Sequence, residues 1–359
     1  MTRGNGADEA RVIQVAGDAT ADWLVFGSNP DHGAGLRFSY EWDVRASVGL
    51  AVKPGGAALL TALLESIKSD KRVPSHRVRV AGTKLSPQLL NDPQAADLTR
   101  TYTLWAPYPR RRGVDEGVWR IREFLGQVPG SAATRAEPSA AGSNAPDCLV
   151  LDDANLGFRG TPSGWPTCLQ AGATGTRHIV LKVANPIGVG PLWEHLTTHH
   201  TRALTVYVSV GDLRKDDSRI GEALSWEQIS TDIVRAVTEH RELSRAARVI
   251  VSLGAAGAVV VESRGASYLV YDASGQEGDW ESARPGFTIG LGTCIVAALA
   301  WQVGLAPESP VWLEGVRRGL LAARRLHEQG YELMQPPEPS GLRFPLRAVS
   351  SVVAADAPA

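Results

Sequence analysis

The segment 285–293 joins a glycine-rich turn to a strongly apolar stretch. Gly290 and Gly292 come directly before Thr293, and residues 293–303 are apolar on nearly every side, which predicts a buried helix. Glycines let the backbone turn tightly, and the N–H groups at a helix start attract negative charge. We therefore expect a site for a phosphate, or for the charge that develops during phosphoryl transfer. A plain turn packed under the helix is the alternative.

Two carboxylates and a glycine pair form a second group of candidates. Asp18 and Asp22 lie four residues apart, just past a strand predicted over residues 11–16. There they are placed to bind sugar hydroxyls, although Asp also caps turns and helices. Gly55 and Gly56 open a predicted helix. Their N–H groups are candidates for binding hydroxyls or a phosphate, with simple helix capping as the alternative.

A third candidate is the strand exit over residues 249–257, which reads VIVSLGAAG. A strand that ends in a glycine turn can lie flat against an adenine or a ribose, because the glycines carry no side chain that would hold the ligand away. An ordinary strand exit is the alternative.

The elements that must position these residues alternate along the chain. Strands are predicted over residues 11–16, 148–151, 178–183, 204–210 and 248–253. Helices are predicted over residues 56–68, 225–240, 293–303 and 311–327, the second beginning with a capping box formed by Ser225 and Gln228. This alternation predicts an α/β fold with a mostly parallel sheet covered on both faces, and a ligand site beyond the carboxyl ends of the strands.

Two stretches, residues 27–52 and 99–128, depart from this alternation. They contain alternating or aromatic-rich segments that predict antiparallel strands outside the main sheet, which would form a small lid. A decorated edge of the core is the alternative. We expect one domain over residues 11–345, with flexible segments at 1–10, 129–146 and 346–359, the second of which is rich in Pro, Gly, Ser and Ala.

Composition excludes several classes of protein. Apolar residues make up 43% of the 359 residues and charged residues 21%, so the chain is not disordered in bulk. A net charge of −1 provides no field that attracts nucleic acid or an anionic membrane. Three cysteines without a CxxC motif predict neither a disulfide framework nor a zinc site, and we expect no metal held by the protein alone. The polar N-terminus predicts no secretory signal, so we expect a cytoplasmic protein.

Together these segments resemble the ribokinase/PfkB superfamily of carbohydrate and nucleoside kinases. The order matches over about residues 11–335: a first strand followed by Asp22, a Gly-Gly helix, a lid in two inserted pieces, a Ser-Leu-Gly-x-x-Gly strand exit and a Gly-x-Gly turn that opens a buried helix. The resemblance implies a three-layer α/β/α ribokinase-like fold with a mostly parallel central sheet and a small β lid. It also implies phosphate transfer from ATP, with Mg²⁺, to a sugar or nucleoside hydroxyl.

The resemblance also implies residue roles. Asp22 would contact substrate hydroxyls, and Gly55 and Gly56 would line the substrate pocket. The segment 152–159 resembles the family's D-x-N-x-R stretch near the phosphates, and within it Asn155 is the candidate for substrate binding. The residues implied along the nucleotide are Ser252, Leu253, Gly254 and Gly257, and those implied to form the anion hole are Gly290 and Gly292. Lids of this type also pair between subunits, so a homodimer through the lid is an expected arrangement.

The sequence departs from the family at one position. The family's catalytic motif reads G-A-G-D, and its Asp takes the proton from the attacking hydroxyl, whereas Thr293 stands in the fourth position here. A threonine hydroxyl does not act as a general base near neutral pH without help, and loss of a general base costs ~10²–10⁴ in rate. Candidates for a substitute base, named only because they follow predicted strands, are Asp18, Asp152, Asp153 and Asp212.

Three functions are therefore consistent with the sequence. The first is a kinase for a sugar or nucleoside, motivated by the full set of family landmarks. The second is a catalytically impaired nucleotide- or metabolite-binding module, a pseudokinase, that acts through a partner protein, motivated by Thr293. The third is a structural or interaction protein, motivated by ten tryptophans, several of them in the predicted lid. In the lid, Arg120 and Arg122 lie near aromatic residues and are candidates for clamping a phosphorylated ligand.

Overall fold

The computed structural model describes residues 11–28, 49–69, 78–82, 101–107, 116–128, 145–169, 176–221, 225–263, 265–270, 290–307, 311–329 and 347–349. Predictions for residues 1–10 and for most of 129–146 lie outside this set, as do residues 285–289, which precede the glycine turn.

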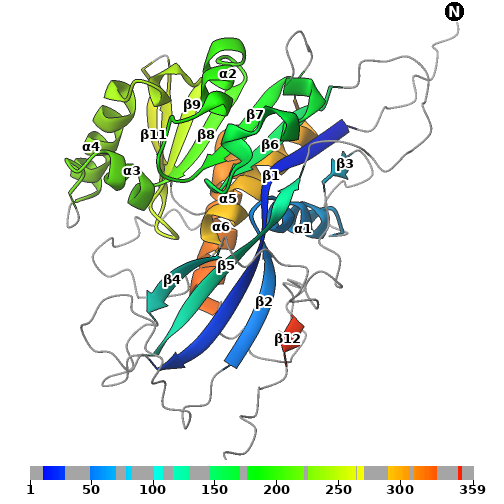
Figure 1. The fold of residues 1–359 in the computed structure, drawn as a ribbon. Coiled ribbons are helices and arrows are strands. Elements are labelled where there is room, and N and C mark those ends of the chain that lie inside the picture. Colours follow the sequence, from blue (N-terminus) through cyan, green and yellow to red (C-terminus); the bar gives the residue numbers. More distant parts are fainter. Residues whose placement is uncertain are drawn as a thin grey trace, which may run out of the picture.

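Among the described residues, a single sheet of 12 strands runs through the molecule (Figure 1). Its central part is parallel, because β1 pairs with β6, β6 with β7, β7 with β8 and β8 with β9 in the same direction. The bounds of these strands are Arg11–Ser28 (β1), Cys148–Asp153 (β6), His178–Val183 (β7), Leu204–Ser209 (β8) and Arg248–Ser252 (β9). Two antiparallel strands, β10 (Ala258–Glu262) and β11 (Ser267–Val270), extend the sheet beyond β9. The predicted, mostly parallel α/β sheet is confirmed.

Helices cover both faces of this sheet, as Figure 1 shows. One face packs against α1 (Gly56–Ser69), α5 (Leu291–Leu305) and α6 (Trp312–Gln329). The other packs against α2 (Pro191–His199), α3 (Val210–Asp216) and α4 (Trp226–Glu239). Each buried strand contributes alternate side chains to the two cores, which explains why its sequence is almost continuously apolar. The three-layer arrangement places the start of α5 at the carboxyl edge of the sheet.

The helices lie close to their predicted bounds because their local signals are strong. The Ser225 side chain accepts a hydrogen bond from the backbone N–H of Gln228 at 3.2 Å, which caps α4 as predicted. Gly290, with φ of 94°, stands immediately before α5. A left-handed residue at this point favours glycine, because a Cβ would clash with the backbone there.

The first strand is much longer than predicted. The expected strand over 11–16 ends where Gly17 interrupts the apolar run, but β1 continues through to Ser28. Its first half pairs in parallel with β6 and with β3 (Val78–Ala81), and its second half pairs with β2 (Gly49–Gly55) and β5 (Glu116–Val128) in antiparallel fashion. Asp18 and Asp22 therefore lie within a strand and not in a loop beyond one.

The predicted lid is built on this continuation of β1. Strand β4 (Thr101–Pro107) pairs with β5, and both run antiparallel as expected. They are not separate from the main sheet, however, because β1 belongs to both parts and joins them (Figure 1). Part of the tail that we expected to be flexible also pairs: residues 347–349 form β12, which lies along β2. Residues 29–48 of the predicted lid lie outside the described set.

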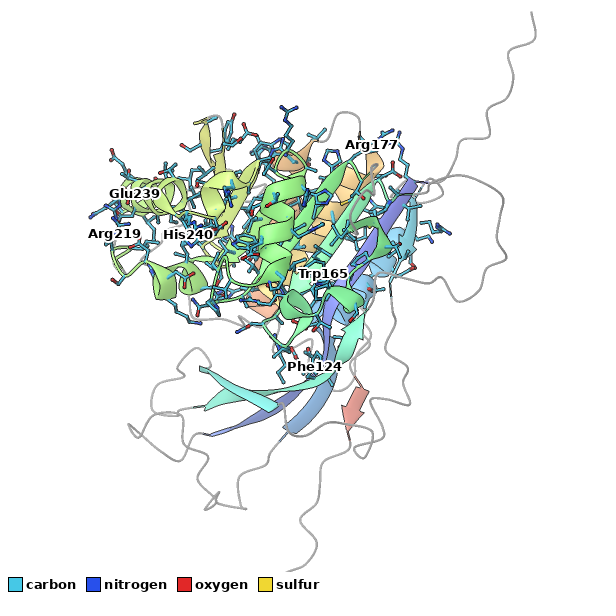
Figure 2. All side chains as sticks on the ribbon, turned by 45° about the horizontal axis from the view of Figure 1, so that its top comes forward. Phe124, Trp165, Arg177, Arg219, Glu239 and His240 are labelled. Atoms are coloured by element: carbon cyan, nitrogen blue, oxygen red, sulfur yellow. The ribbon has the colours of Figure 1, made fainter. Side chains whose placement is uncertain are left out.

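Surface features at the far side of the sheet are remote from the lid. Figure 2 shows Arg219, Glu239 and His240 around α4, whereas Phe124 lies where β5 passes from the core toward the lid. The ion pair between Arg219 and Glu239, at 2.9 Å, is exposed on both sides and contributes little to stability. No helix in the part of the chain that the structure describes has the length and apolar character needed to cross a membrane.

Candidate functional site

Asp22 and the glycine pair meet where the core sheet passes into the lid. Gly55 lies opposite Thr20 on β1, and a Cβ at Gly55 would come 2.5 Å from an oxygen of Asp22. Only glycine leaves room for the Asp22 carboxylate here. Gly56 follows at once, with φ of 56°, and opens α1. Asp22, Gly55 and Gly56 therefore lie together, and their predicted roles in substrate binding stay predictions.

The Asp22 carboxylate has partners on two strands. It is 2% exposed, and one of its oxygens accepts a hydrogen bond from the Thr20 hydroxyl at 3.0 Å. The same oxygen lies 3.3 Å from Nε of Arg122, whose side chain is 21% exposed. Arg122 comes from the predicted arginine cluster of the lid and stands opposite Asp22 in the pairing of β1 with β5. The corner formed by Asp22, Gly55 and Arg122 therefore combines a carboxylate with a cation that solvent reaches.

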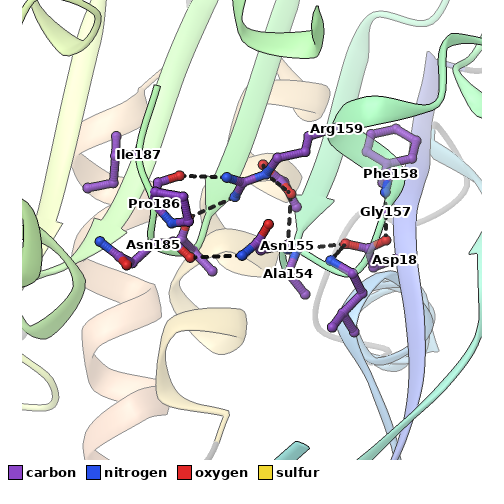
Figure 3. Close-up of polar contacts among 12 residues, drawn as sticks. Asp18, Ala154, Asn155, Gly157, Phe158, Arg159, Asn185, Pro186 and Ile187 are labelled. Carbon is purple, nitrogen blue, oxygen red and sulfur yellow. Dashed lines mark hydrogen bonds and ion pairs between the residues drawn. The ribbon is translucent and has the colours of Figure 1, made fainter. Parts of the chain in front are cut away.

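Asp18 has a different environment from the one predicted. The residue is fully buried, and its two carboxyl oxygens accept three backbone hydrogen bonds, from Ala154 at 3.0 Å, Leu156 at 3.1 Å and Phe158 at 3.0 Å (Figure 3). Burial raises the pKa of Asp18 to about 6, against the lowering effect of the Leu156 and Phe158 N–H donors. The expectation that Asp18 binds substrate hydroxyls is corrected, because the carboxyl group anchors the loop after β6.

That loop, residues 154–160, is held at its other end by Arg159. Its Nε donates to Asp153 at 3.0 Å, and its two terminal nitrogens donate to the carbonyls of Ala184 at 2.9 Å and Pro186 at 2.6 Å (Figure 3). Burial raises the pKa of Asp153, while Arg159 acts in the opposite direction. Arg159, which the D-x-N-x-R resemblance placed near phosphates, is buried and used to join β6 to the segment after β7.

Asn155 lies exposed at the tip of this loop. It has a positive φ of 61°, which asparagine tolerates better than most residues, and its side-chain amide donates to the carbonyl of Asn185 at 3.3 Å. The loop thus presents Asn155 at the carboxyl edge of the sheet, and its role in substrate binding stays a prediction.

The glycine turn stands at the same edge. The first backbone N–H groups of α5, at residues 291–293, have no acceptor within the helix, whereas the N–H of Cys294 already bonds to the carbonyl of Gly290 at 3.1 Å. Thr293 is 4% exposed in the first turn. The helix start therefore offers N–H donors without an acceptor in the helix and partial positive charge, which suit an anion.

Tyr207, which the sequence did not single out, lies beneath this turn. A Cβ at Gly292 would come 2.5 Å from the Tyr207 hydroxyl oxygen, so only glycine fits without a shift. The hydroxyl is 2.6 Å from Oγ of Ser252, and both residues are buried. The Ser252 hydroxyl is therefore engaged by Tyr207, and the place of Ser252 along a nucleotide stays a prediction. Burial raises the pKa of Tyr207, so this hydroxyl stays protonated.

The remaining predicted nucleotide residues form a tight turn after β9. The N–H of Leu253 donates to the carbonyl of Gly257 at 2.9 Å, and Gly254 has a φ of 69°. No atom lies within 4 Å of a Cβ built on Gly254, whereas one on Gly257 would contact the ring of Trp226 at 3.3 Å. Gly254 is therefore the member of this turn with open space beside it, and Gly257 is required for packing.

A charged pair joins β6 and β7 at this edge. Nζ of Lys182 lies 2.7 Å from Oδ2 of Asp152, while Oδ1 of Asp152 is buried and has no hydrogen-bond partner. Two residues back along each strand, Val150 and Val180 pack in the core that contains α5. Because side chains alternate along a strand, the pair lies on the α5 face. Lys182 was missed from the sequence, although a lysine inside the apolar strand HIVLKV is itself a signal.

Asp212, a further carboxylate named from the sequence, begins α3. Its N–H donates to the Ser209 hydroxyl at 3.0 Å, which in turn donates to Oδ2 of Asp212 at 2.8 Å, and Lys215 contacts Oδ1 at 3.0 Å. The residue is thus part of the helix cap. Within the described ranges, His, Cys, Asp and Glu side chains do not form a group of three or more that would hold a metal ion.

Comparison with known proteins identifies the fold. No family model matches the sequence, and no curated protein matches it. The structure is similar to that of ribokinase from Cryptococcus neoformans var. grubii serotype A in complex with ADP, with a TM-score of 0.50 and 12% sequence identity over 89% of this chain and 94% of that chain. The chain therefore has the ribokinase-like α/β fold.

Two other solved structures resemble the chain more weakly. A double mutant of fructokinase from Vibrio cholerae, with fructose, ADP and potassium ion bound, has a TM-score of 0.41 and 16% identity over 89% of this chain and 92% of that chain. A nucleoside kinase from Burkholderia thailandensis in complex with inosine has a TM-score of 0.41 and 11% identity over 88% of this chain and 90% of that chain.

Proposed function

We propose that the protein is a kinase that transfers the γ-phosphate of ATP to a hydroxyl of a sugar or nucleoside. The observation that carries this proposal is the place of two features within a ribokinase-like fold. Asp22 lies on the continuation of β1 past Gly17, where the parallel pairing with β6 ends, and Gly292 at the start of α5 packs against Tyr207 near the carboxyl end of β8. In open α/β sheets the carboxyl edge of the strands is where ligands bind.

The start of α5 would bind the phosphate being transferred. The first N–H groups of α5, at residues 291–293, have no acceptor within the helix, and together with the helix dipole they would stabilise negative charge as it develops. Positioning and charge stabilisation supply most of the catalysis in phosphoryl transfer. The ribokinase that this fold resembles was solved with ADP, which supports ATP as the donor here.

The corner at the lid would bind the acceptor. The Asp22 carboxylate accepts hydrogen bonds from hydroxyls, and the N–H groups at Gly55 and Gly56 donate to them. Arg122 adds a cation beside Asp22, within reach of solvent. A polyol with neighbouring hydroxyls fits this set, since it offers donors to the carboxylate and acceptors to the N–H groups and Arg122.

Mg²⁺ would enter with ATP. The described residues provide no dedicated cluster of ligands, but Mg²⁺ keeps several waters and is commonly bound through substrate phosphates with one or two carboxylates. The ion would neutralise charge on the phosphates, and the protein would orient the nucleotide beside the start of α5.

The test is release of ADP by the purified protein from Mg-ATP with a panel of sugars and nucleosides. Asp22→Ala, prepared identically, is the control for contaminating kinases and should lose most of the activity. Asp217→Asn removes a carboxylate bonded to Arg219, remote from the lid, and should leave the activity unchanged.

Calorimetric titration with Mg-ATP separates the two leading hypotheses. Binding together with ADP release supports the kinase. Binding without ADP release from any acceptor would contradict the kinase and favour the impaired binding module that Thr293 suggested. No binding at all would make the glycine turn structural and overturn both.

A further inference from the structure

In the charged pair Asp152–Lys182, one carboxylate oxygen of Asp152 has no partner, and the packing of the fold does not explain this. Asp152 is 1% exposed, and Lys182 satisfies only its Oδ2. Its Oδ1 is buried without any hydrogen-bond donor. Leaving a buried acceptor unpaired costs about 1–3 kcal/mol, and more for a charged group. A donor that reaches this oxygen is therefore stabilised, and a substrate hydroxyl is such a donor.

The neighbouring carboxylates have no comparable free oxygen. Asp18 accepts three backbone N–H groups, and Asp153 is bonded to Arg159 and to the N–H of Asn155 at 3.1 Å. Asp212 is bonded to Ser209 and Lys215. Of the four carboxylates that the sequence predicts as candidates for a substitute base, only Asp152 has a buried oxygen without a hydrogen-bond partner.

The position of Asp152 also suits the reaction. Its side chain lies on the face of the sheet that α5 covers, whereas the preceding leucine and the following Asp153 face the opposite core. Asp152 stands at the end of β6, directly opposite Gly17 of β1, and Lys182 stands beside it near the end of β7. Both are therefore at the edge where α5 begins.

Lys182 supports this task by its position. Its Nζ lies 2.7 Å from Oδ2 and holds that oxygen, so Oδ1 has a defined direction. The Lys182 side chain is 21% exposed, so the pair is open to solvent on the lysine side.

We propose that Asp152 is the general base of this protein, with Lys182 as its positioning residue. This rests on the proposed kinase function. Oδ1 of Asp152 takes the proton from the reacting hydroxyl, and the hydroxyl oxygen forms a bond to the γ-phosphorus of ATP. The bond from that phosphorus to the β-γ bridging oxygen breaks, and ADP leaves with its electron pair. The proton on Asp152 then passes to solvent. Thr293 keeps its place in the anion site without acting as a base.

The experiment measures kcat for ADP release and the Kd for Mg-ATP in parallel. Asp152→Asn should lower kcat by ~10²–10⁴, the usual contribution of a general base, and leave the Kd unchanged. Lys182→Met should lower kcat less. The matched control is Glu262→Gln. It removes a carboxylate on β10 that pairs with Arg248 at the start of β9, the end of that strand opposite to its carboxyl end, and it should leave kcat unchanged.

Rescue distinguishes a base from a merely structural carboxylate. Thr293→Asp places a carboxylate where the family resemblance sets the base, so it should restore part of kcat to Asp152→Asn. If Asp152→Asn fails to fold, Asp152→Glu keeps the charge and moves the carboxylate, and a fall in kcat at unchanged Kd supports the proposal.

One outcome would overturn the assignment of the base alone. It is an active wild type whose kcat is unaffected by Asp152→Asn, which would mean that Oδ1 binds only an ordered water. An inactive wild type would instead overturn the proposed kinase function, and activity gained on Thr293→Asp would then also mean that Asp152 is not competent as a base.

Discussion

Asp18 and Asp22 lie on the same strand, four residues apart, yet their surroundings differ. Asp18 lies one residue past the part of β1 that pairs with β6, and backbone N–H groups of the loop after β6 surround its carboxyl group. Asp22 lies farther along β1, between β2 and β5, where its partners include the side chains of Thr20 and Arg122. Backbone donors fix a carboxylate as part of the scaffold, whereas a side-chain donor that solvent can reach, as Arg122 is here, leaves it able to exchange that partner for a ligand.

The largest expected effect comes from Asp18→Ala. The change removes the acceptor of three buried N–H groups, and each unsatisfied donor costs about 1–3 kcal/mol, so we expect the free energy of unfolding to fall by about 3 kcal/mol or more. Urea unfolding followed by circular dichroism measures it. A fall in the free energy of unfolding of less than about 1 kcal/mol would mean that water replaces the carboxylate easily. Asp18 would then not be the structural anchor that distinguishes it from Asp22.

The next effect is a pH dependence that belongs to Asp18. Its pKa is about 6 in the folded protein against 3.8 ordinarily, so between these values the folded state binds more protons than the unfolded chain. The contribution of Asp18 to stability is therefore highest below about pH 4 and falls by about 2–3 kcal/mol as the pH rises through 6. Unfolding of the wild type and Asp18→Asn from pH 4 to 7 isolates this slope. Parallel curves would contradict it.

Asp22→Asn should affect function more than stability. The amide keeps the size of the carboxylate but removes its charge, and hydrogen bonds to charged groups contribute about 1.5–3 kcal/mol. We expect kcat/KM for the acceptor to fall about tenfold to a hundredfold, with the Kd for Mg-ATP unchanged. Steady-state kinetics at saturating ATP provide the measurement. A loss of affinity for Mg-ATP would mean that Asp22 contacts the nucleotide and not the acceptor.

The smallest effect is expected from Gly55→Ala. A Cβ there overlaps the Thr20 hydroxyl and an oxygen of Asp22, and both side chains must shift, at a cost of about 1 kcal/mol. Acceptor affinity should fall with it, because the Asp22 carboxylate moves. Gly160→Ala is the matched control, since no atom lies within 4 Å of a Cβ at that glycine. Equal melting temperatures for the two variants would show that the corner tolerates a methyl group.

From local signals in the sequence, the helices and strands could be predicted better than the contacts that their side chains make. Helices α1, α4, α5 and α6 were predicted because apolar spacing and the Ser225 cap act within a few residues. The length of β1 was not predicted, because its second half forms a strand only through pairing with β2 and β5. The glycines at 55, 56, 290 and 292 were recognised as candidates for close approach, although the sequence did not show what approaches them.

The sequence alone determined the alternation of strands and helices, the apolar strands of a doubly covered sheet, and the glycine turn that begins a buried helix. These depend on residues close together in the chain. Only the tertiary structure decided that Asp18 anchors a loop 136 to 140 residues away, that Tyr207 lies under Gly292, and that Lys182 binds one oxygen of Asp152 and leaves the other free. The physical reason is that burial and hydrogen-bond partners are set by segments far apart in sequence, and the same carboxylate serves as scaffold or as reactive group according to what those segments bring to it.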